Sequence, residues 1–140
     1  MKNYLAVSLF GLLISMSASC LAQSENSALD KRCKVVEQTT DEMYENGALI
    51  QCYFPNMALL NAYQEYRDLL GDDRKYLAKK LISNKDVDVN CTDDNCSSIH
   101  YRWSGDKQLN IEQNFAGGET TLKFIQKNND THLDIRYFPD

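Results

Sequence analysis

The sequence predicts an α+β domain in which about three N-terminal helices pack on one face of a C-terminal antiparallel sheet of four to five strands. Two observations predict this class. Apolar residues recur every three or four positions in the first half of the chain, which is the period of an amphipathic helix. After Ser83 the period becomes two, and short turn signals such as Gly117-Gly118 separate the alternating segments. Helices followed by an antiparallel meander define the α+β class.

Residues 1–22 have the three parts of a secretory signal peptide, so residues 23–140 are expected to form the single domain. Lys2 supplies the positive charge, residues 5–16 the apolar segment, and small residues up to Ala22 the cleavage site. An apolar segment of about a dozen residues is too short to cross a bilayer as a helix, which takes about 20. We therefore expect no transmembrane segment and a periplasmic or secreted location. Cys20, which follows two small residues, leaves open an alternative in which the protein is lipidated and anchored to a membrane.

Three helices are expected before residue 83. The first covers residues 29–47, where apolar positions follow the helical period and Gly47 suits a helix end. The second starts at Pro55 and ends at Gly71. The third starts at Asp72 or Asp73 as its cap, and its apolar positions are Tyr76, Leu77, Leu81 and Ile82. Residues 48–54 form a short apolar segment whose type stays open.

Alternation predicts strands from residue 87 onward, with one face buried and one facing water. The inward positions are Val87, Val89, Ile99, Tyr101, Trp103, Leu109, Ile111, Phe115, Leu122, Phe124, Leu133, Ile135 and Tyr137. The outward positions include His100, Arg102, Asn110, Glu112, Asn114, His132, Asp134 and Arg136. An alternative fold is similar to that of nuclear transport factor 2-like (NTF2-like) domains, in which helices and a curved sheet form a cone. It requires an early strand between the helices, for which residues 48–54 are the candidate.

The cysteine content predicts disulfides. Four cysteines follow the signal peptide, namely Cys33, Cys52, Cys91 and Cys96, an even number in an exported chain. Three pairings are possible, and we favour Cys33–Cys52 with Cys91–Cys96, because the second pair is close in sequence and flanks a polar turn. The first pair would join two helical segments. A zinc site is the alternative, but the spacing has no CxxC pair.

The charge of the chain bears on its partners. The sequence has 15 basic and 20 acidic residues, a net charge of −5, and removal of Lys2 with the signal peptide makes it more negative. Such a domain is repelled by nucleic acid and by anionic lipid, whereas a basic partner protein is permitted.

Catalytic motifs are weak in this sequence. His100 and His132 are the histidines available as general bases. His132, Asp134 and Arg136 share a strand face, but residues two apart on a strand do not face each other. No GxSxG segment is present, and the cysteines are expected to be oxidised. We therefore predict neither a cofactor nor a metal site, and no enzymatic activity.

Aromatic and acidic residues supply the candidate interface. Tyr and Trp are preferred anchors of protein interfaces, and Tyr101 and Trp103 share a strand, while Asp93 and Asp94 lie in the polar turn between Cys91 and Cys96. The combined features predict a small exported binding or inhibitor protein of the bacterial envelope, such as an immunity protein that occludes the cleft of a toxin or hydrolase. Two alternatives are an anchored envelope lipoprotein or assembly accessory, and a small secreted hydrolase built on carboxylates or His132.

Overall fold

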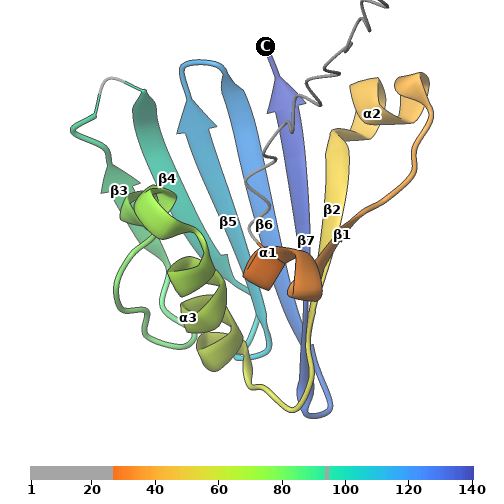
Figure 1. Cartoon of the computed structure of the whole chain (residues 1–140). Coiled ribbons are helices and arrows are strands. Elements are labelled where there is room, and N and C mark those ends of the chain that lie inside the picture. The colour runs from red at the N-terminus through yellow and green to blue at the C-terminus, as the bar shows by residue number, and fades with distance from the viewer. Residues whose placement is uncertain (1–26, 94) are drawn as a thin grey trace, which may run out of the picture.

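The computed structural model describes residues 27–93 and 95–140, so the signal peptide expected at residues 1–22, Cys20 and Asp94 lie outside the described residues. Figure 1 shows the elements in chain order. They are α1 (Ser27–Arg32), β1 (Cys33–Val35), α2 (Thr40–Asn46), β2 (Ala48–Phe54), α3 (Leu59–Leu69), the 3₁₀-helix η1 (Gly71–Tyr76), β3 (Val87–Asn90), β4 (Cys96–Trp103), β5 (Gln108–Phe115), β6 (Gly118–Lys127) and β7 (Asp130–Pro139).

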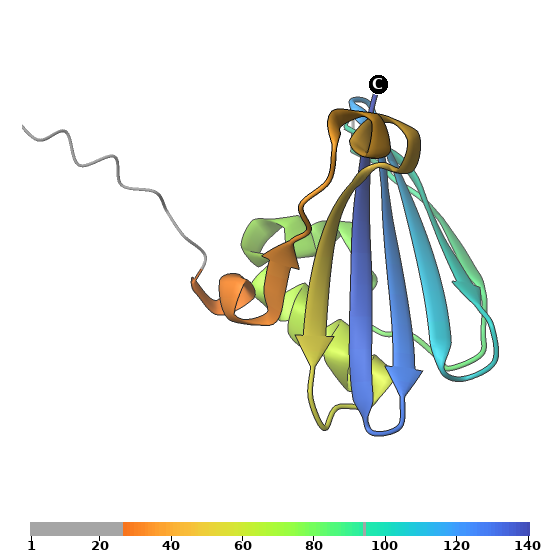
Figure 2. The same cartoon turned by 90° about the vertical axis from the view of Figure 1, so that its right-hand side faces the viewer.

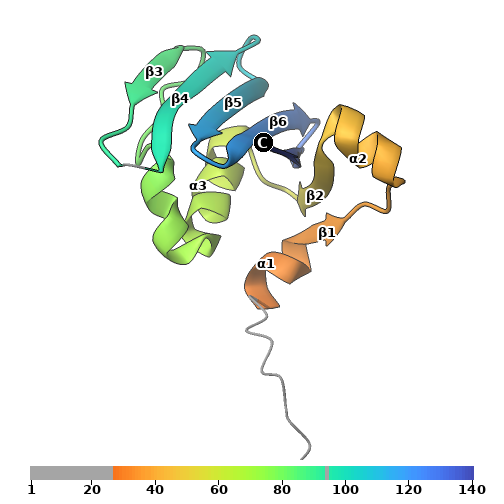
Figure 3. The same ribbon diagram turned by 90° about the horizontal axis from the view of Figure 1, so that it is seen from above.

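The seven strands form one antiparallel sheet in the order β1-β2-β7-β6-β5-β4-β3. Strands β3 to β7 make a continuous meander, and β2 pairs with β7 at its far side. The helices α1 and α3 lie on one face of the sheet, which curves around α3, whereas the other face is uncovered by described elements (Figure 2 and Figure 3). The α+β class is therefore confirmed, but the expected count of four to five strands is too low.

The core lies between α3 and the curved face of the sheet. Because opposite residues of antiparallel strands share a face, Ile111, Leu122 and Ile135 form one buried row across β5, β6 and β7. Phe124 lies in the neighbouring row, and the rings of Tyr63 and Tyr66 on α3 contact it edge-on, with centroids 5.8 and 6.0 Å away. Each such side chain contributes roughly 1.5–3 kcal/mol on burial.

The single helix predicted over residues 29–47 is wrong, because strand β1 and an extended segment interrupt it. Cys33 pairs with Cys52 on β2, and this sheet contact outweighs the helical spacing. The helix α2 then begins with a capping box: the Thr39 hydroxyl accepts from the Glu42 N–H, and the Glu42 carboxylate accepts from the Thr39 N–H at 2.8 Å. The Thr39 hydroxyl also donates to this carboxylate at 3.1 Å, and the bonds from the Thr39 N–H and then from the hydroxyl lower the pKa of Glu42.

The other two expected helices also differ from expectation, and the segment whose type was left open is a strand. Residues 48–54 form β2, which supplies the strand between helices that the NTF2-like alternative requires. The third helix, expected to reach Ile82, is wrong beyond Tyr76, since only η1 forms and Leu77 is extended (φ −124°, ψ 136°). The second helix begins at Leu59 rather than at Pro55.

Residues 76–78 are bonded by side chains instead of by a helix. The Tyr76, Leu77 and Ala78 carbonyls accept from Gln113, Arg67 and Tyr63, at 3.0, 3.1 and 2.7 Å. The Ala78 N–H donates to the Tyr101 hydroxyl at 2.8 Å. These bonds satisfy backbone groups that the absent helix would have paired.

The structure contains two disulfides, Cys33–Cys52 and Cys91–Cys96, which are the pairs favoured from the spacing. The first joins neighbouring strands β1 and β2, not two helices as expected. The second closes the loop between β3 and β4. Two disulfides fit an extracytoplasmic protein. Within the described ranges, every helix is too short or too polar to span a membrane.

Candidate functional site

The uncovered face of the sheet carries polar side chains in two rows that run across the strands. Residues at opposite positions of neighbouring strands lie on the same face, so the register defines each row. The first row is Lys34, Gln51, Asp134, Lys123, Asn110 and Arg102, from six neighbouring strands. The second, which is polar except for Leu49 at one end, is Leu49, Arg136, Thr121, Glu112, His100 and Asp88.

Two open depressions lie over this face. The first has a volume of about 530 Å³ and is lined by outward side chains of β4 to β7, including His100, Lys123 and Arg136. The second, of about 500 Å³, lies over β1, β2 and β7 and is lined by residues that include Lys31 and Lys34. Both are lined by Asp134, so they adjoin at β7. Their volumes are in the range of ligand pockets.

Positive charge is in excess in the linings of the two depressions, although the whole chain has a net charge of −5. Arg102 pairs with Asp88, and Arg32 pairs with Glu65 at 2.7 Å. Among the described residues, four lining cations have no carboxylate partner: Lys31, Lys34, Lys123 and Arg136. The lining carboxylates are Asp134, which accepts from Gln51 at 3.0 Å, and Glu112, which accepts from Asn114 at 3.1 Å.

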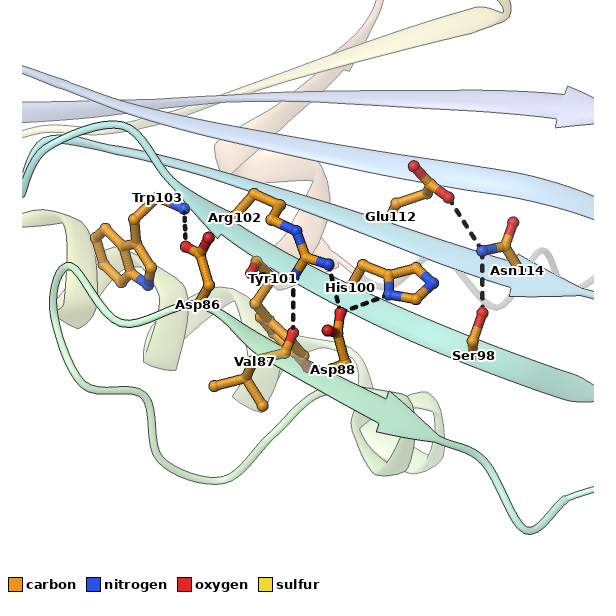
Figure 4. A network of polar contacts seen from close by, with 10 residues as sticks. All are labelled: Asp86, Val87, Asp88, Ser98, His100, Tyr101, Arg102, Trp103, Glu112 and Asn114. Atoms are coloured by element: carbon orange, nitrogen blue, oxygen red, sulfur yellow. Dashed lines mark hydrogen bonds and ion pairs between the residues drawn. The ribbon is translucent and has the colours of Figure 1, made fainter.

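Asp88 is the centre of a polar network at the β3 side of the face (Figure 4). Its Oδ1 contacts His100 Nδ1 at 2.7 Å and also accepts from Arg102 Nη2. Arg102 Nη1 donates to the Tyr101 carbonyl at 3.0 Å and to the Val87 carbonyl at 3.3 Å. The bonds from His100 and then from Arg102 lower the pKa of Asp88. The network therefore fixes the side chains of β3 and β4 in one geometry.

A second group of polar contacts lies on β4 and β5. Asn114 donates from Nδ2 both to Glu112 Oε1 and to the Ser98 hydroxyl, at 3.1 and 3.2 Å (Figure 4). Ser98 is thus held by an amide rather than by His100. The Asp88–His100 pair resembles half of an acid–base triad, but within the described residues no hydroxyl or thiol is hydrogen-bonded to His100. The polar side chains of this face are therefore suited to binding a partner through ion pairs and hydrogen bonds.

His132 and Asp134 share a strand face but have different partners, as the strand geometry predicts. His132 is exposed, and its ring lies beside that of Tyr53 with centroids 5.0 Å apart. Asp134 is bonded to Gln51 instead. Both residues line the second depression.

The residues predicted as an interface do not form one surface. Tyr101 is completely buried, so it belongs to the core and not to an interface, contrary to the prediction. Trp103 is partly buried, and its Nε1 is enclosed without a hydrogen-bond partner in the described part of the chain. Asp93 is held by the Asn95 N–H, by Lys75 and by the Tyr76 hydroxyl, and the first two of these bonds lower its pKa most.

The exposed aromatic residues and the aligned cations have no clear signal in the sequence. Tyr44, Tyr53 and Tyr137 are 91, 44 and 42 % exposed, whereas Tyr101 is not exposed at all. The outward positions of the strands could be read from the alternation, but only the strand order aligns Lys34 and Lys123 with Asp134 in one row.

The described residues contain no group of three or more His, Cys, Asp or Glu side chains placed to hold a metal ion. Comparison of the chain with protein-family models, with curated proteins and with solved structures found no significant match.

Proposed function

We propose that this chain is a small exported binding protein of the inhibitor or immunity type, which uses the uncovered sheet face to occlude a partner protein in the bacterial envelope. The observation that carries the proposal is the pair of adjoining depressions on that face, lined by cations without carboxylate partners. A sheet held by two disulfides is rigid, so binding orders few groups and loses little entropy.

The local charge favours an acidic patch on the partner. The net charge of the whole chain permits a basic partner, but at physiological ionic strength charges more than about 8 Å away are largely screened. The charges that line the two depressions, and not the net charge of the chain, therefore determine which partner surface is attracted. In the first row, Lys34 and Lys123 are three strands apart, or roughly 14 Å at about 4.8 Å per strand. Carboxylates at that spacing on the partner would complement both lysines.

The NTF2-like arrangement of the fold is part of the same proposal. It is supported by β2 between α2 and α3 and by the curved sheet around α3 (Figure 3). It rests on element order, and the proposed binding role does not depend on it.

The test is a comparison of two charge-reversed baits. The oxidised protein is immobilised and used to capture partners from envelope extract of its source organism, beside Lys34→Glu/Lys123→Glu and beside Lys79→Glu/Lys80→Glu. The control lysines are exposed, lie outside both depressions and give the same change in net charge. We expect the first variant to lose captured partner by at least about tenfold, since close interfacial charge pairs are worth about 1.5 kcal/mol or more, and the control to retain it.

Equal capture by both variants would refute the assignment of this face. Capture of no protein by the unmodified bait under oxidising conditions would refute the binding function itself.

A further inference from the structure

A second candidate site lies at the end of the sheet, next to the end of α3. Its inner part is on the helix-covered side, and its outer part extends to Glu119, which is paired with Asn114 of the uncovered face. Two adjoining cavities of about 200 and 370 Å³ share Phe115, Thr120 and Tyr137 in their linings. The inner cavity lies between the α3–η1 segment, which contributes Tyr66 and Asp73, and the β5, β6 and β7 strands. Its residues differ from those of both depressions on the uncovered face.

The hydroxyl of Tyr66 has no protein partner in this cavity. Three tyrosines are buried among the described residues, and Tyr63 and Tyr101 are hydrogen-bonded to the two backbone groups of Ala78. Tyr66 is only 3 % exposed, yet its hydroxyl makes no hydrogen bond within the described part of the chain. The hydroxyl is nevertheless not enclosed, since among the described residues the enclosed side-chain atom without a partner is Trp103 Nε1. It therefore lies open to the cavity that Tyr66 lines, where a ligand can bond to it.

The charge of the lining is of one sign. Asp73 lines the inner cavity and Glu119 the outer one, and no Lys or Arg lines either. Burial, the Tyr137 phenol and the Asp73 carboxylate all raise the pKa of Tyr66. Burial and the same carboxylate raise the pKa of Tyr137. Both phenols therefore stay neutral at physiological pH, with oxygens that accept a hydrogen bond.

We propose that these cavities bind an organic cation, consisting of an ammonium group on an apolar body. The ammonium group has donors for Asp73 and for the phenol oxygens of Tyr66 and Tyr137, and aromatic faces attract cations. The apolar body would contact Leu70 and Phe115, which line the inner cavity. An anionic ligand is disfavoured by Asp73 and Glu119. This site is independent of the proposed protein-binding face.

The experiment measures binding of simple amines against matched neutral alcohols. Phenethylamine and hexylamine, with phenethyl alcohol and hexanol as isosteres, are titrated into the oxidised protein while the amide signals of Thr120 and Tyr66 are followed by NMR. We expect saturable shifts for the amines with a Kd in the millimolar range or below, as suits fragments of this size. The alcohols should bind at least about tenfold more weakly, because the charge-assisted bonds to Asp73 are lost.

Three variants locate the site. Asp73→Asn should remove the preference for amines, whereas Asp72→Asn, on the same 3₁₀-helix but outside the lining, should keep it. Tyr66→Phe should weaken amine binding about three- to tenfold, the effect of one lost hydrogen bond, and should leave the unfolding midpoint unchanged because no protein bond is removed. Equal binding of amines and alcohols, absence of saturable shifts, or equal effects of the two Asp variants would overturn the proposal.

Discussion

Replacing Tyr101 by phenylalanine removes one oxygen atom and tests how the segment 76–78 is held. The Tyr101 hydroxyl accepts from the Ala78 N–H at 2.8 Å, and the Tyr63 hydroxyl donates to the Ala78 carbonyl at 2.7 Å. Without the Tyr101 oxygen, the N–H faces a completely buried ring. An unsatisfied buried donor costs about 1–3 kcal/mol, more than the net value of a made hydrogen bond. We therefore expect Tyr101→Phe to lose about 1–3 kcal/mol of unfolding free energy and Tyr63→Phe to lose about 1 kcal/mol.

The assay is urea unfolding of the oxidised protein, with the midpoint and the m-value fitted together. Tyr44→Phe is the control, since Tyr44 is 91 % exposed and a surface change of this kind stays within about 0.5 kcal/mol. The double variant Tyr63→Phe/Tyr101→Phe should be non-additive by at least about 0.5 kcal/mol, because both hydroxyls bond the same residue. If Tyr101→Phe unfolds at the same urea concentration as Tyr44→Phe, the argument that side chains replace the missing helix at residues 76–78 is refuted.

Three further predictions concern the turn, the charges and the disulfides. A Cβ on Gly118 would lie 2.2 Å from the Phe138 carbonyl oxygen, and φ there is +128°. Gly118→Ala should therefore lower the unfolding free energy by about 2 kcal/mol or more, as measured by a thermal melt. Gly117→Ala, whose Cβ would have no neighbour within 4 Å, should lower it little. The pKa of Asp88 is lowered in the fold, so its pairing stabilises the protein above the unfolded pKa of about 4 and stops doing so as the pH falls through the folded value. A carboxyl NMR titration should show that His100→Gln raises this pKa, and an unchanged value would contradict the pairing. Loss of Cys33–Cys52, whose cysteines are 19 residues apart in sequence, should lower the unfolding free energy by about 3 kcal/mol through loop entropy. Loss of Cys91–Cys96 should lower it by about 2 kcal/mol. Urea denaturation of the two double Cys→Ala variants tests this, and a larger loss for Cys91–Cys96 would contradict it.

The C-terminal half of the fold could be predicted because its sheet has one wet and one buried face. Leu109 and Ile111, for example, alternate with Asn110 and Glu112, and this pattern is incompatible with a helix. The N-terminal half could not be predicted in this way. The spacing of four between Leu29 and Cys33 suits a helix, but Cys33 lies in a strand that is defined by its pairing with Cys52, a contact over 19 residues. Local periodicity does not report such a contact.

In the candidate site, too, local features could be predicted from the sequence and long-range ones could not. Alternation along each strand is enough to place Arg102, Asn110 and Asp134 on the outward face. Their alignment with Lys123 and Lys34 depends on the sheet order, in which the first strands of the chain pair with the last. The side chains that bond the carbonyls of residues 76–78 could not be predicted either. Gln113 comes from a strand 37 residues away from Tyr76, and the Arg67 bond to Leu77 requires the helical period to end at residue 77.

The short strand β1 makes the solubility of this chain depend on the redox state of the compartment in which it folds. It covers part of the outer edge of the seven-residue strand β2 and is bonded to it through Cys33–Cys52. If the thiols were reduced, a three-residue strand would detach easily and leave the β2 edge with unpaired N–H and carbonyl groups. Such an edge recruits strands from other molecules and leads to aggregation. Oxidation of this one pair thus protects the monomer as well as stabilising it, and synthesis in a reducing compartment should yield insoluble protein.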